Sequence, residues 1–324
     1  MPTVLHETSF DDLKDLIGDV IKALPYDRDI ISPKIHMGQS LDTKDRWIIP
    51  DMTISVTALE GPTEVVLIPF YGECSLTETD EHVFEKVEDV IAMHPDLICV
   101  VVVLVREATK YAALVAGSTA SNALYNETDN EPQPLSLKSF INLRTTPRSF
   151  GEPIMVAGHT WCHVASVEYF VWVRKDETPI DIRSNDPADM VYGILVPMID
   201  MNAVTQMLER GLTKIKESFL TFQEQIEPDL DFTTLAEARI ITLSDWNWKS
   251  ASKCLNSASD TTAHKHYLKW YKALFVTEEG DNASYVDLQE VYEGNQVIAE
   301  GSERKHALPS SKLPTSRFKI PKLA

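Results

Sequence analysis

The stretch that decides the fold runs from Pro50 to Ser75 and reads PDMTISVTALEGPTEVVLIPFYGECS. Two runs of strand-forming residues flank a turn at Gly61-Pro62, which predicts an antiparallel hairpin. In that hairpin Asp51, at the start of the first strand, lies opposite Glu73, near the end of the second. Alternation along the strand places Ser75 on the same face as Glu73. Two carboxylates on neighbouring strand ends form a suitable site for a hard divalent cation such as Mg²⁺.

The patterns on either side of this hairpin predict one compact α/β core over residues 1–115. Apolar residues at helical spacing predict a helix that starts with Ser9 as its N-cap and a second helix that starts near Thr77. A strand over residues 30–37 precedes the hairpin. The run Leu97–Val105 lacks polar alternation, which is typical of a strand covered on both faces in the middle of a sheet. The predicted order is therefore helix, three strands, helix, strand.

The rest of the chain predicts an insert, an extension and a tail. Residues 116–150 are polar and loop-like, with a short helix near 135–143. Residues 151–276 predict a β-rich segment followed by helices over 201–224 and 260–275, which pack on the core. Residues 277–324 lose apolar periodicity, and we expect them to be mostly disordered.

Composition narrows the possible partners and compartments. The 324 residues carry a formal net charge of −19, which works against a general affinity for nucleic acid or anionic membranes. No signal peptide is visible, and no apolar run is long enough to span a bilayer. Four scattered cysteines without a pairing motif fit a reducing compartment. We therefore expect an intracellular protein, cytoplasmic or nuclear, with no membrane partner, whose oligomeric state the sequence leaves open.

The order of elements, with Pro50-Asp51 and Glu73-Cys74-Ser75 on its second and third strands, resembles the core of the PD-(D/E)XK nuclease superfamily. The chain also resembles fungal proteins that carry such a nuclease-like domain and have no assigned activity. The resemblance implies a restriction-endonuclease-like α/β core with a β-rich extension and C-terminal helices. It further implies that Asp51 and Glu73 bind Mg²⁺, and that Glu7 supplies an additional acid beside the first helix.

The superfamily's lysine is replaced here by Ser75. A serine hydroxyl is uncharged and a poor base, so it cannot orient and deprotonate an attacking water as a lysine can. Lys86, on the second predicted helix, and Lys34, on the first strand, are candidates for a relocated lysine. The leading interpretation is a PD-(D/E)XK-like protein with a degenerate metal site, a pseudoenzyme that acts as a nucleic-acid-associated or protein-interaction module.

Two alternatives to this interpretation remain open. The first is an active magnesium-dependent nuclease, a phosphodiester hydrolase with a relocated lysine. The second is an acidic scaffold or regulatory protein without a nucleic-acid role, which the net charge of −19 supports. The sequence thus leaves open whether the chain is an enzyme.

A second candidate site is a basic helix near the C-terminus. Lys265, Lys269 and Lys272 recur at helical spacing beside Trp270, a pattern that could hold single-stranded nucleic acid by charge and stacking. The alternative is an amphipathic helix whose aromatic side chains pack inward while its lysines face water. His264 and His266 point in different directions on this helix, and we expect both to be solvated.

Overall fold

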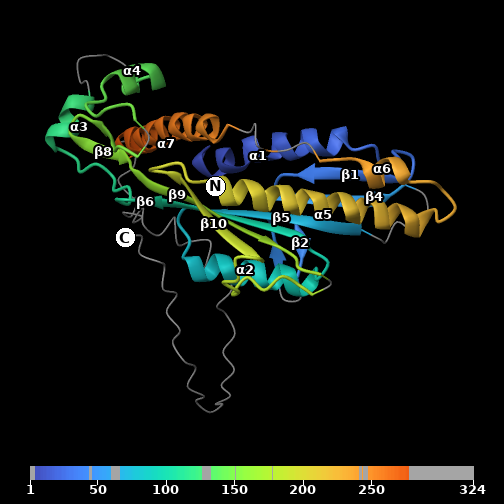
Figure 1. The fold of residues 1–324 in the computed structure, drawn as a ribbon. Coiled ribbons are helices and arrows are strands. Elements are labelled where there is room, and N and C mark those ends of the chain that lie inside the picture. Colours follow the sequence, from blue (N-terminus) through green and yellow to red (C-terminus); the bar gives the residue numbers. More distant parts are fainter. Residues whose placement is uncertain are drawn as a thin grey trace, which may run out of the picture. The chain divides into compact units, whose positions relative to one another are not determined.

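The computed structural model describes residues 4–43, 46–59, 66–125, 133–149, 151–176, 178–240, 243 and 247–276. Residues 1–273 form one compact unit, and its main feature is a mixed six-stranded sheet with helices packed on it (Figure 1). The predicted α/β class is therefore confirmed. The second unit begins at Leu274. The predicted tail, residues 277–324, lies outside the described residues.

The predicted core corresponds to six elements in the expected order: α1 (Val4–Ala23), β1 (Ile31–His36), β4 (Met52–Ala58), β5 (Val66–Ser75), α2 (Asp80–Met93) and β6 (Cys99–Glu107). Two short strands, β2 (Leu41–Asp42) and β3 (Trp47–Ile48), pair with each other between β1 and β4. β1, β4 and β5 are antiparallel neighbours, whereas β5 and β6 run parallel. A parallel pair needs a crossover connection, which α2 supplies.

The segment after the core adds strands to the same sheet. β9 (Val164–Val173) pairs antiparallel with β6, and β10 (Met190–Val196) pairs with β9, so the strand order is β1-β4-β5-β6-β9-β10. β6 therefore lies in the interior of the sheet, as its unbroken apolar sequence predicted. β7 (Ile154–Val156) and β8 (His159–Cys162) form a separate hairpin.

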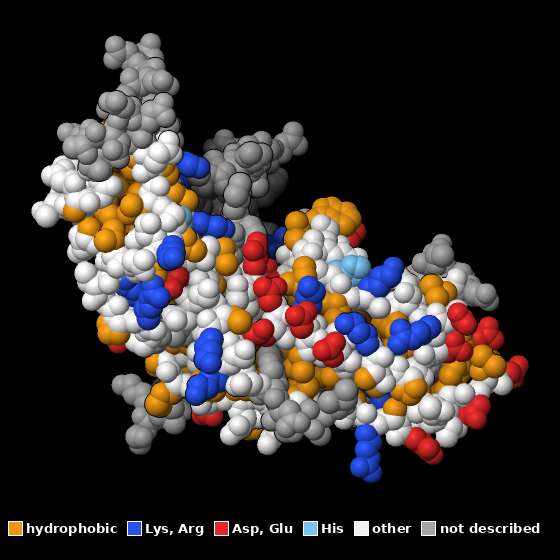
Figure 2. All heavy atoms as spheres, turned by 90° about the horizontal axis from the view of Figure 1, so that it is seen from above, with side chains coloured by type: hydrophobic (Ala, Val, Ile, Leu, Met, Phe, Trp, Pro, Cys, Tyr) orange, Lys and Arg blue, Asp and Glu red, His pale blue; other side chains and the backbone are white. Residues whose placement is uncertain are grey.

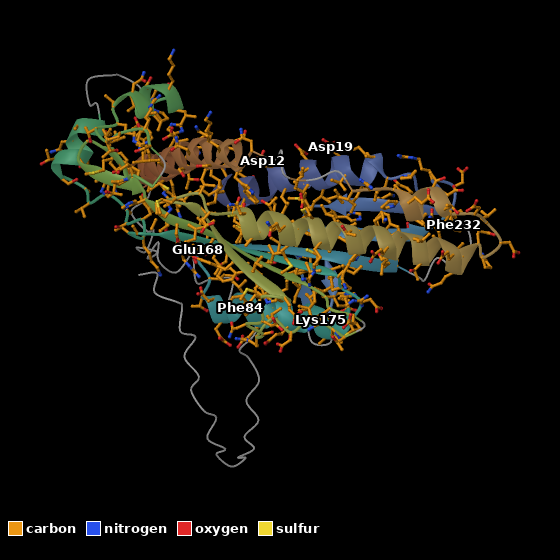
Figure 3. The ribbon with its side chains drawn as sticks, viewed as in Figure 1. Asp12, Asp19, Phe84, Glu168, Lys175 and Phe232 are labelled. Atoms are coloured by element: carbon orange, nitrogen blue, oxygen red, sulfur yellow. The ribbon has the colours of Figure 1, made fainter. Side chains whose placement is uncertain are left out.

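Helices cover both faces of the sheet (Figure 1). α1 and α5 (Asn202–Ile226) pack on one face, where α5 contacts β9 and β10. α2, which carries Phe84 (Figure 3), packs on the other face. The ring of Phe84 meets those of Phe170 and Trp172 of β9 edge-on, with centroids 6.2 and 6.1 Å apart. The remaining helices are α3 (Thr119–Leu124), α4 (Leu137–Asn142), α6 (Thr233–Glu237) and α7 (Trp248–Val276). α7 begins at Trp248, well before the predicted start at residue 260.

The first helix also begins earlier than predicted, at Val4. Ser9 is not an N-cap, because it is buried inside α1 and its hydroxyl donates to the carbonyl oxygen of Leu5 at 2.9 Å. A serine that bonds the carbonyl four residues back stays within the helix instead of starting it. His6 and Glu7 consequently lie on the first turns of α1, which matters for the site described below.

Gly72 allows α1 to lie close against β5. A Cβ atom added at Gly72 would lie 2.7 and 2.9 Å from the ring atoms Cε1 and Cζ of Phe10, whose side chain is fully buried. We expect Gly72→Ala to lower the free energy of unfolding by about 2 kcal/mol through overpacking, measured by urea denaturation. Gly18→Ala is the control, because its Cβ would meet only Ile35 Cδ1 at an ordinary 3.6 Å. Equal stabilities of the two variants would contradict the expectation.

Candidate active site

The β4–β5 hairpin has the register that the sequence predicted at its open end. Met52 lies opposite Gly72, and the backbone N–H of Asp51 donates to the carbonyl oxygen of Gly72 at 3.1 Å. Asp51 directly precedes Met52 and Glu73 directly follows Gly72, so the two acids occupy neighbouring positions on the two strands. The predicted turn at residues 61–62 lies outside the described residues.

The carboxylate of Asp51 is fixed by groups from two other elements. Its Oδ2 accepts a hydrogen bond from the backbone N–H of Cys74 at 2.6 Å, and its Oδ1 lies 3.3 Å from Nδ1 of His6 on α1. The side chain is 18% exposed. Burial raises the pKa of Asp51 to about 7, although the hydrogen bond from Cys74 and the charge of Lys86 oppose this shift.

The carboxylate of Glu73 is still more buried, with 6% of its side chain exposed. Its Oε1 accepts from Nζ of Lys86 at 3.2 Å and its Oε2 accepts from the hydroxyl of Tyr71 at 3.0 Å. Burial raises the pKa of Glu73 to about 7, against the opposing charge of Lys86 and with a further contribution from Asp51. Two neighbouring carboxyl groups with raised pKa values in one site are typical of functional centres.

Lys86 reaches this site from α2. The helix starts after Thr79, whose side chain accepts from the backbone N–H of His82, and Lys86 lies two turns further along. Besides Glu73, its Nζ donates to both carboxylate oxygens of Glu78, each at 2.8 Å. Burial lowers the pKa of Lys86, but Glu73 and Glu78 outweigh this effect and raise it. Lys86 thus stays charged between two acids.

The structure brings three of the predicted site residues together, namely Asp51, Glu73 and Lys86. Ser75 is buried close by, and its hydroxyl donates to the carbonyl oxygen of Glu78 at 3.4 Å. Lys34 and Glu7 are exposed, and among the described residues neither forms a hydrogen bond or ion pair with the two carboxylates.

Three site residues were not predicted, namely His6, Tyr71 and Glu78. α1 starts at Val4, so both His6 and Glu7 lie on the helix, and it is His6 that faces Asp51 in place of the predicted Glu7. Burial is the main cause that lowers the pKa of His6. Tyr71 lies two residues before Glu73, so strand alternation alone would have placed it on the same face.

The donor set suits magnesium better than zinc. Among the described residues, no three or more His, Cys, Asp and Glu side chains are grouped so that they could hold a metal ion together. Mg²⁺ uses one or two carboxylates and keeps several waters, so Asp51 and Glu73 are a sufficient protein contribution. Zinc requires three or four protein ligands. Each of the four carboxylate oxygens has a protein partner, and a magnesium site at Asp51 and Glu73 stays a prediction.

The second candidate site, on α7, is arranged differently from the predicted stacking platform. Lys265, Lys269 and Lys272 are exposed, but Trp270 is only 5% exposed and faces the interior beside Tyr267. Trp270 is thus not available to stack on a base. The amphipathic alternative describes this helix better.

The two histidines of α7 are not solvated, contrary to expectation. Nε2 of His264 lies 2.8 Å from the carbonyl oxygen of Leu135, and Nδ1 of His266 lies 2.7 Å from that of Trp161. Burial lowers the pKa of His266. Both rings fix α7 to neighbouring segments because one nitrogen of each ring contacts a backbone carbonyl oxygen.

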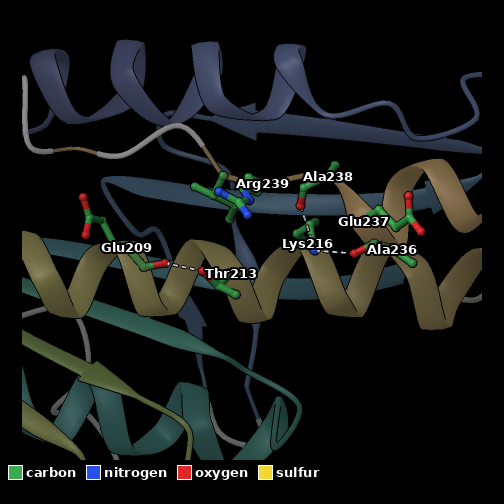
Figure 4. A pocket seen from close by; sticks show the side chains of 8 residues that line it. Glu209, Thr213, Lys216, Ala236, Glu237, Ala238 and Arg239 are labelled. Atoms are coloured by element: carbon green, nitrogen blue, oxygen red, sulfur yellow. Dashed lines mark hydrogen bonds between the residues drawn. The ribbon is translucent and has the colours of Figure 1, made fainter.

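A shallow, open pocket of about 420 Å³ lies between α5 and the segment that follows α6 (Figure 4). Lys216 reaches into this region, but its Nζ donates to the carbonyl oxygens of Ala236 and Ala238 at 3.0 Å each. The ammonium group is therefore used to fix the chain and is not available for a ligand. None of the residues of the carboxylate site lines this pocket.

Comparison with known proteins adds no relative. No family model, no curated protein and no solved structure matches this chain. No helix in the described part of the chain has the length and apolar character needed to cross a membrane. The arrangement of the chain's own residues is therefore the basis for a functional proposal.

Proposed function

We propose that this protein is a PD-(D/E)XK-like, magnesium-dependent phosphodiester hydrolase in which Lys86 has taken the role of the lysine replaced by Ser75. The observation that carries this proposal is the 3.2 Å distance between Nζ of Lys86 and Oε1 of Glu73. A lysine on α2 thereby places its charge beside the second acid of the predicted pair. The restriction-endonuclease-like fold belongs to the same proposal, and the β4–β5 hairpin followed by α2 and the parallel strand β6 supports it.

Each residue has a distinct task in this proposal. Asp51 and Glu73 would hold the magnesium ion, which supplies Lewis-acid activation of the phosphate and of a bound water when it is present. The backbone N–H of Cys74 orients Asp51, and the hydroxyl of Tyr71 orients Glu73. Lys86 orients the attacking water and offsets the negative charge that grows on the phosphate. His6 fixes the second oxygen of Asp51.

The raised pKa values support a cation site. Burial is the main cause that raises the pKa of both carboxyl groups to about 7, and repulsion by a neighbouring carboxylate, Glu78 for Asp51 and Asp51 for Glu73, raises each pKa further. A divalent cation would remove that repulsion, because an opposite charge within a few ångströms favours the ionised form.

A nicking assay on supercoiled plasmid and labelled single-stranded DNA tests the function. We expect Mg²⁺-dependent cleavage that Asp51→Asn and Glu73→Gln each reduce by about 100-fold or more, because a group that stabilises the transition state is worth about that much. Glu85→Gln is the matched control, since Glu85 is exposed on the same helix as Lys86. Absence of cleavage by the unmodified protein, or cleavage that neither site variant lowers, would refute the hydrolase.

A non-catalytic module is the second candidate, and one observation favours it. The ammonium of Lys86 already contacts both oxygens of Glu78 at 2.8 Å, and the side chains of His6, Asp51, Glu73 and Lys86 are between 6 and 23% exposed. Such a site can persist as a structural cluster. Calorimetric binding of Mg²⁺ without any cleavage would support this degenerate-site interpretation, with nucleic acid or a protein as partner. The acidic scaffold without a nucleic-acid role also stays a prediction, supported by the net charge of −19.

A further inference from the structure

One region of the molecule has a charge opposite to that of the whole chain. The described residues of 108–163 and 247–273, here called the basic region, contain nine Lys and Arg and two Asp and Glu, a net charge of +7. Residues 126–132, outside the described part, add three acidic residues, so the net charge stays at +4. The whole chain has −19. This imbalance makes the basic region the place where a polyanion is least repelled.

Nearly all of this positive charge faces solvent. Eight of the nine basic side chains are exposed, and the ninth, Arg144, is buried and paired with Asp260 at 3.2 Å. Lys and Arg side chains lie on the side of the molecule where α7 lies and also in the middle and toward the other end, whereas Asp and Glu lie mainly in the middle and at the other end (Figure 2). The positive charge of these eight side chains therefore lies at the surface of the molecule.

The packing of α7 determines which lysines share a face. Its inner side is held by Tyr267, whose hydroxyl oxygen accepts from the N–H of Leu135 at 2.9 Å, and by the histidine contacts described above. Lys265, Lys269 and Lys272 follow the i, i+4, i+7 spacing on the opposite, exposed side. These three residues, here called the lysine ridge, extend over about 10 Å of helix.

The N-terminal half of α7 is less suitable for an anion. Burial and the negative charges of Asp12 and Asp11 raise the pKa of the Cys254 thiol, so the acids of α1 lie near that half of the helix. The favourable surface is therefore restricted to the lysine ridge and the basic residues around it.

We propose that the lysine ridge is a docking surface for the phosphate backbone of a single-stranded nucleic acid. The choice of nucleic acid among polyanions rests on the proposed hydrolase function, whose substrate is a phosphodiester. No large apolar side chain is exposed over residues 248–274 of α7, so this part of the helix lacks the apolar face that a membrane-surface helix inserts. With Trp270 buried, binding depends on charge rather than stacking, and it is independent of base sequence.

The test measures the affinity for a fluorescein-labelled single-stranded DNA of mixed sequence by anisotropy, in EDTA, over a series of salt concentrations. The ridge variant carries Lys265→Gln, Lys269→Gln and Lys272→Gln. We expect its slope of log K against log salt to be smaller by about 2, because each phosphate contact on a single strand contributes about 0.7. At low salt its affinity falls about tenfold or more.

The control variant carries Lys22→Gln, Lys34→Gln and Lys175→Gln, which remove the same charge from exposed positions elsewhere. Lys175, for example, is well separated from α7 (Figures 1 and 3). The control should keep the slope and affinity of the unmodified protein. Equal losses in both variants, or no loss in the ridge variant, would overturn the proposal. So would a lack of binding at low salt, or binding to phosphatidylserine vesicles in place of DNA.

The outcomes for the ridge and for the hydrolase are separable. Glu85→Gln, an exposed substitution outside the carboxylate site and the ridge, should bind the labelled DNA as tightly as the unmodified protein. If the ridge variant binds normally while Glu73→Gln loses cleavage, the ridge proposal fails and the hydrolase stands. If binding depends on the ridge but no cleavage occurs, the hydrolase fails and the ridge stands. Circular dichroism of all variants checks that the exposed substitutions leave the fold unchanged.

Discussion

Lys86→Met should reduce magnesium-dependent cleavage by about 100-fold or more, whereas Lys34→Met should leave the rate unchanged. The reason is the position of Lys86, whose Nζ lies 3.2 Å from Oε1 of Glu73, while Lys34 is exposed on β1. A preorganised positive charge at the site of transition-state charge is worth about two to three orders of magnitude in rate. Single-turnover cleavage of a labelled oligonucleotide at saturating Mg²⁺ measures this difference directly. Loss of cleavage in the Lys34 variant, or its retention in the Lys86 variant, would contradict the relocation.

Removal of Lys86 also removes the counter-ion of Glu73, so stability must be measured alongside the rate. The matched control is the double variant Lys86→Met with Ser75→Lys, which returns the ammonium to the strand position that the superfamily uses. Ser75 is 2% exposed and lies on the Glu73 face, so a lysine there would have to displace the contact between its hydroxyl and Glu78. We expect a partial recovery of the rate relative to Lys86→Met at comparable thermal stability. This recovery would separate a catalytic role from a merely structural one.

The sequence predicted the sheet better than it predicted the helix termini. The register at the open end of β4 and β5, where Met52 lies opposite Gly72, is the one that strand alternation predicts, and the interior position of β6 follows from its unbroken apolar run. These signals are local. The start of α1 was wrong because Ser9 has the side chain of a good N-cap, and only tertiary packing decides that its hydroxyl bonds Leu5 inside the helix.

The same distinction between local signals and tertiary packing explains which site residues could be predicted from the sequence. Asp51 and Glu73 were predictable because strand pairing alone makes them neighbours. The choice between Lys34 and Lys86 was not, since it depends on which face of the sheet α2 covers. His6 was missed because its contact with Asp51 requires both the early start of α1 and the close approach of Phe10 to Gly72. Contacts between distant segments have no local sequence signal.

In the absence of metal, the protein should become less stable as the pH rises from about 4.5 to about 7. A carboxyl group whose pKa is higher in the folded chain binds its proton more tightly when folded, so ionisation favours unfolding. Burial raises the pKa of Glu73 from 4.5 to about 7, which corresponds to about 3 kcal/mol at 1.36 kcal/mol per unit. Asp51 acts in the same direction, from 3.8 to about 7. Urea denaturation at several pH values in EDTA measures the trend.

Other groups titrate in the same range, so a variant must isolate Glu73. The lowered pKa of His6 makes the folded state lose stability as the pH falls through 6.5, which opposes the trend expected from Glu73. The raised pKa values of four other carboxyl groups act in the same direction as Glu73, namely those of Asp11, Asp12, Glu107 and Asp260. Glu73→Gln removes one ionisation and keeps an oxygen that can accept from Lys86. We therefore expect it to have a flatter pH profile than the unmodified protein and to exceed its stability at pH 8 by about 1–3 kcal/mol.

Added Mg²⁺ should reverse the order of stability of the unmodified protein and Glu73→Gln at pH 8. A cation that binds only the folded protein stabilises it by mass action, and the ionised pair of Asp51 and Glu73 is the state that binds it. The unmodified protein should therefore gain stability at pH 8 when Mg²⁺ is added, while Glu73→Gln and Asp51→Asn should not. Parallel pH profiles of the unmodified protein and Glu73→Gln would refute the buried ionisation, and an equal response of all three proteins to Mg²⁺ would refute the metal site. Packing alone favours a neutral side chain at such a buried position. A carboxylate that lowers stability without a bound cation and raises it with one therefore contributes to binding and not to packing.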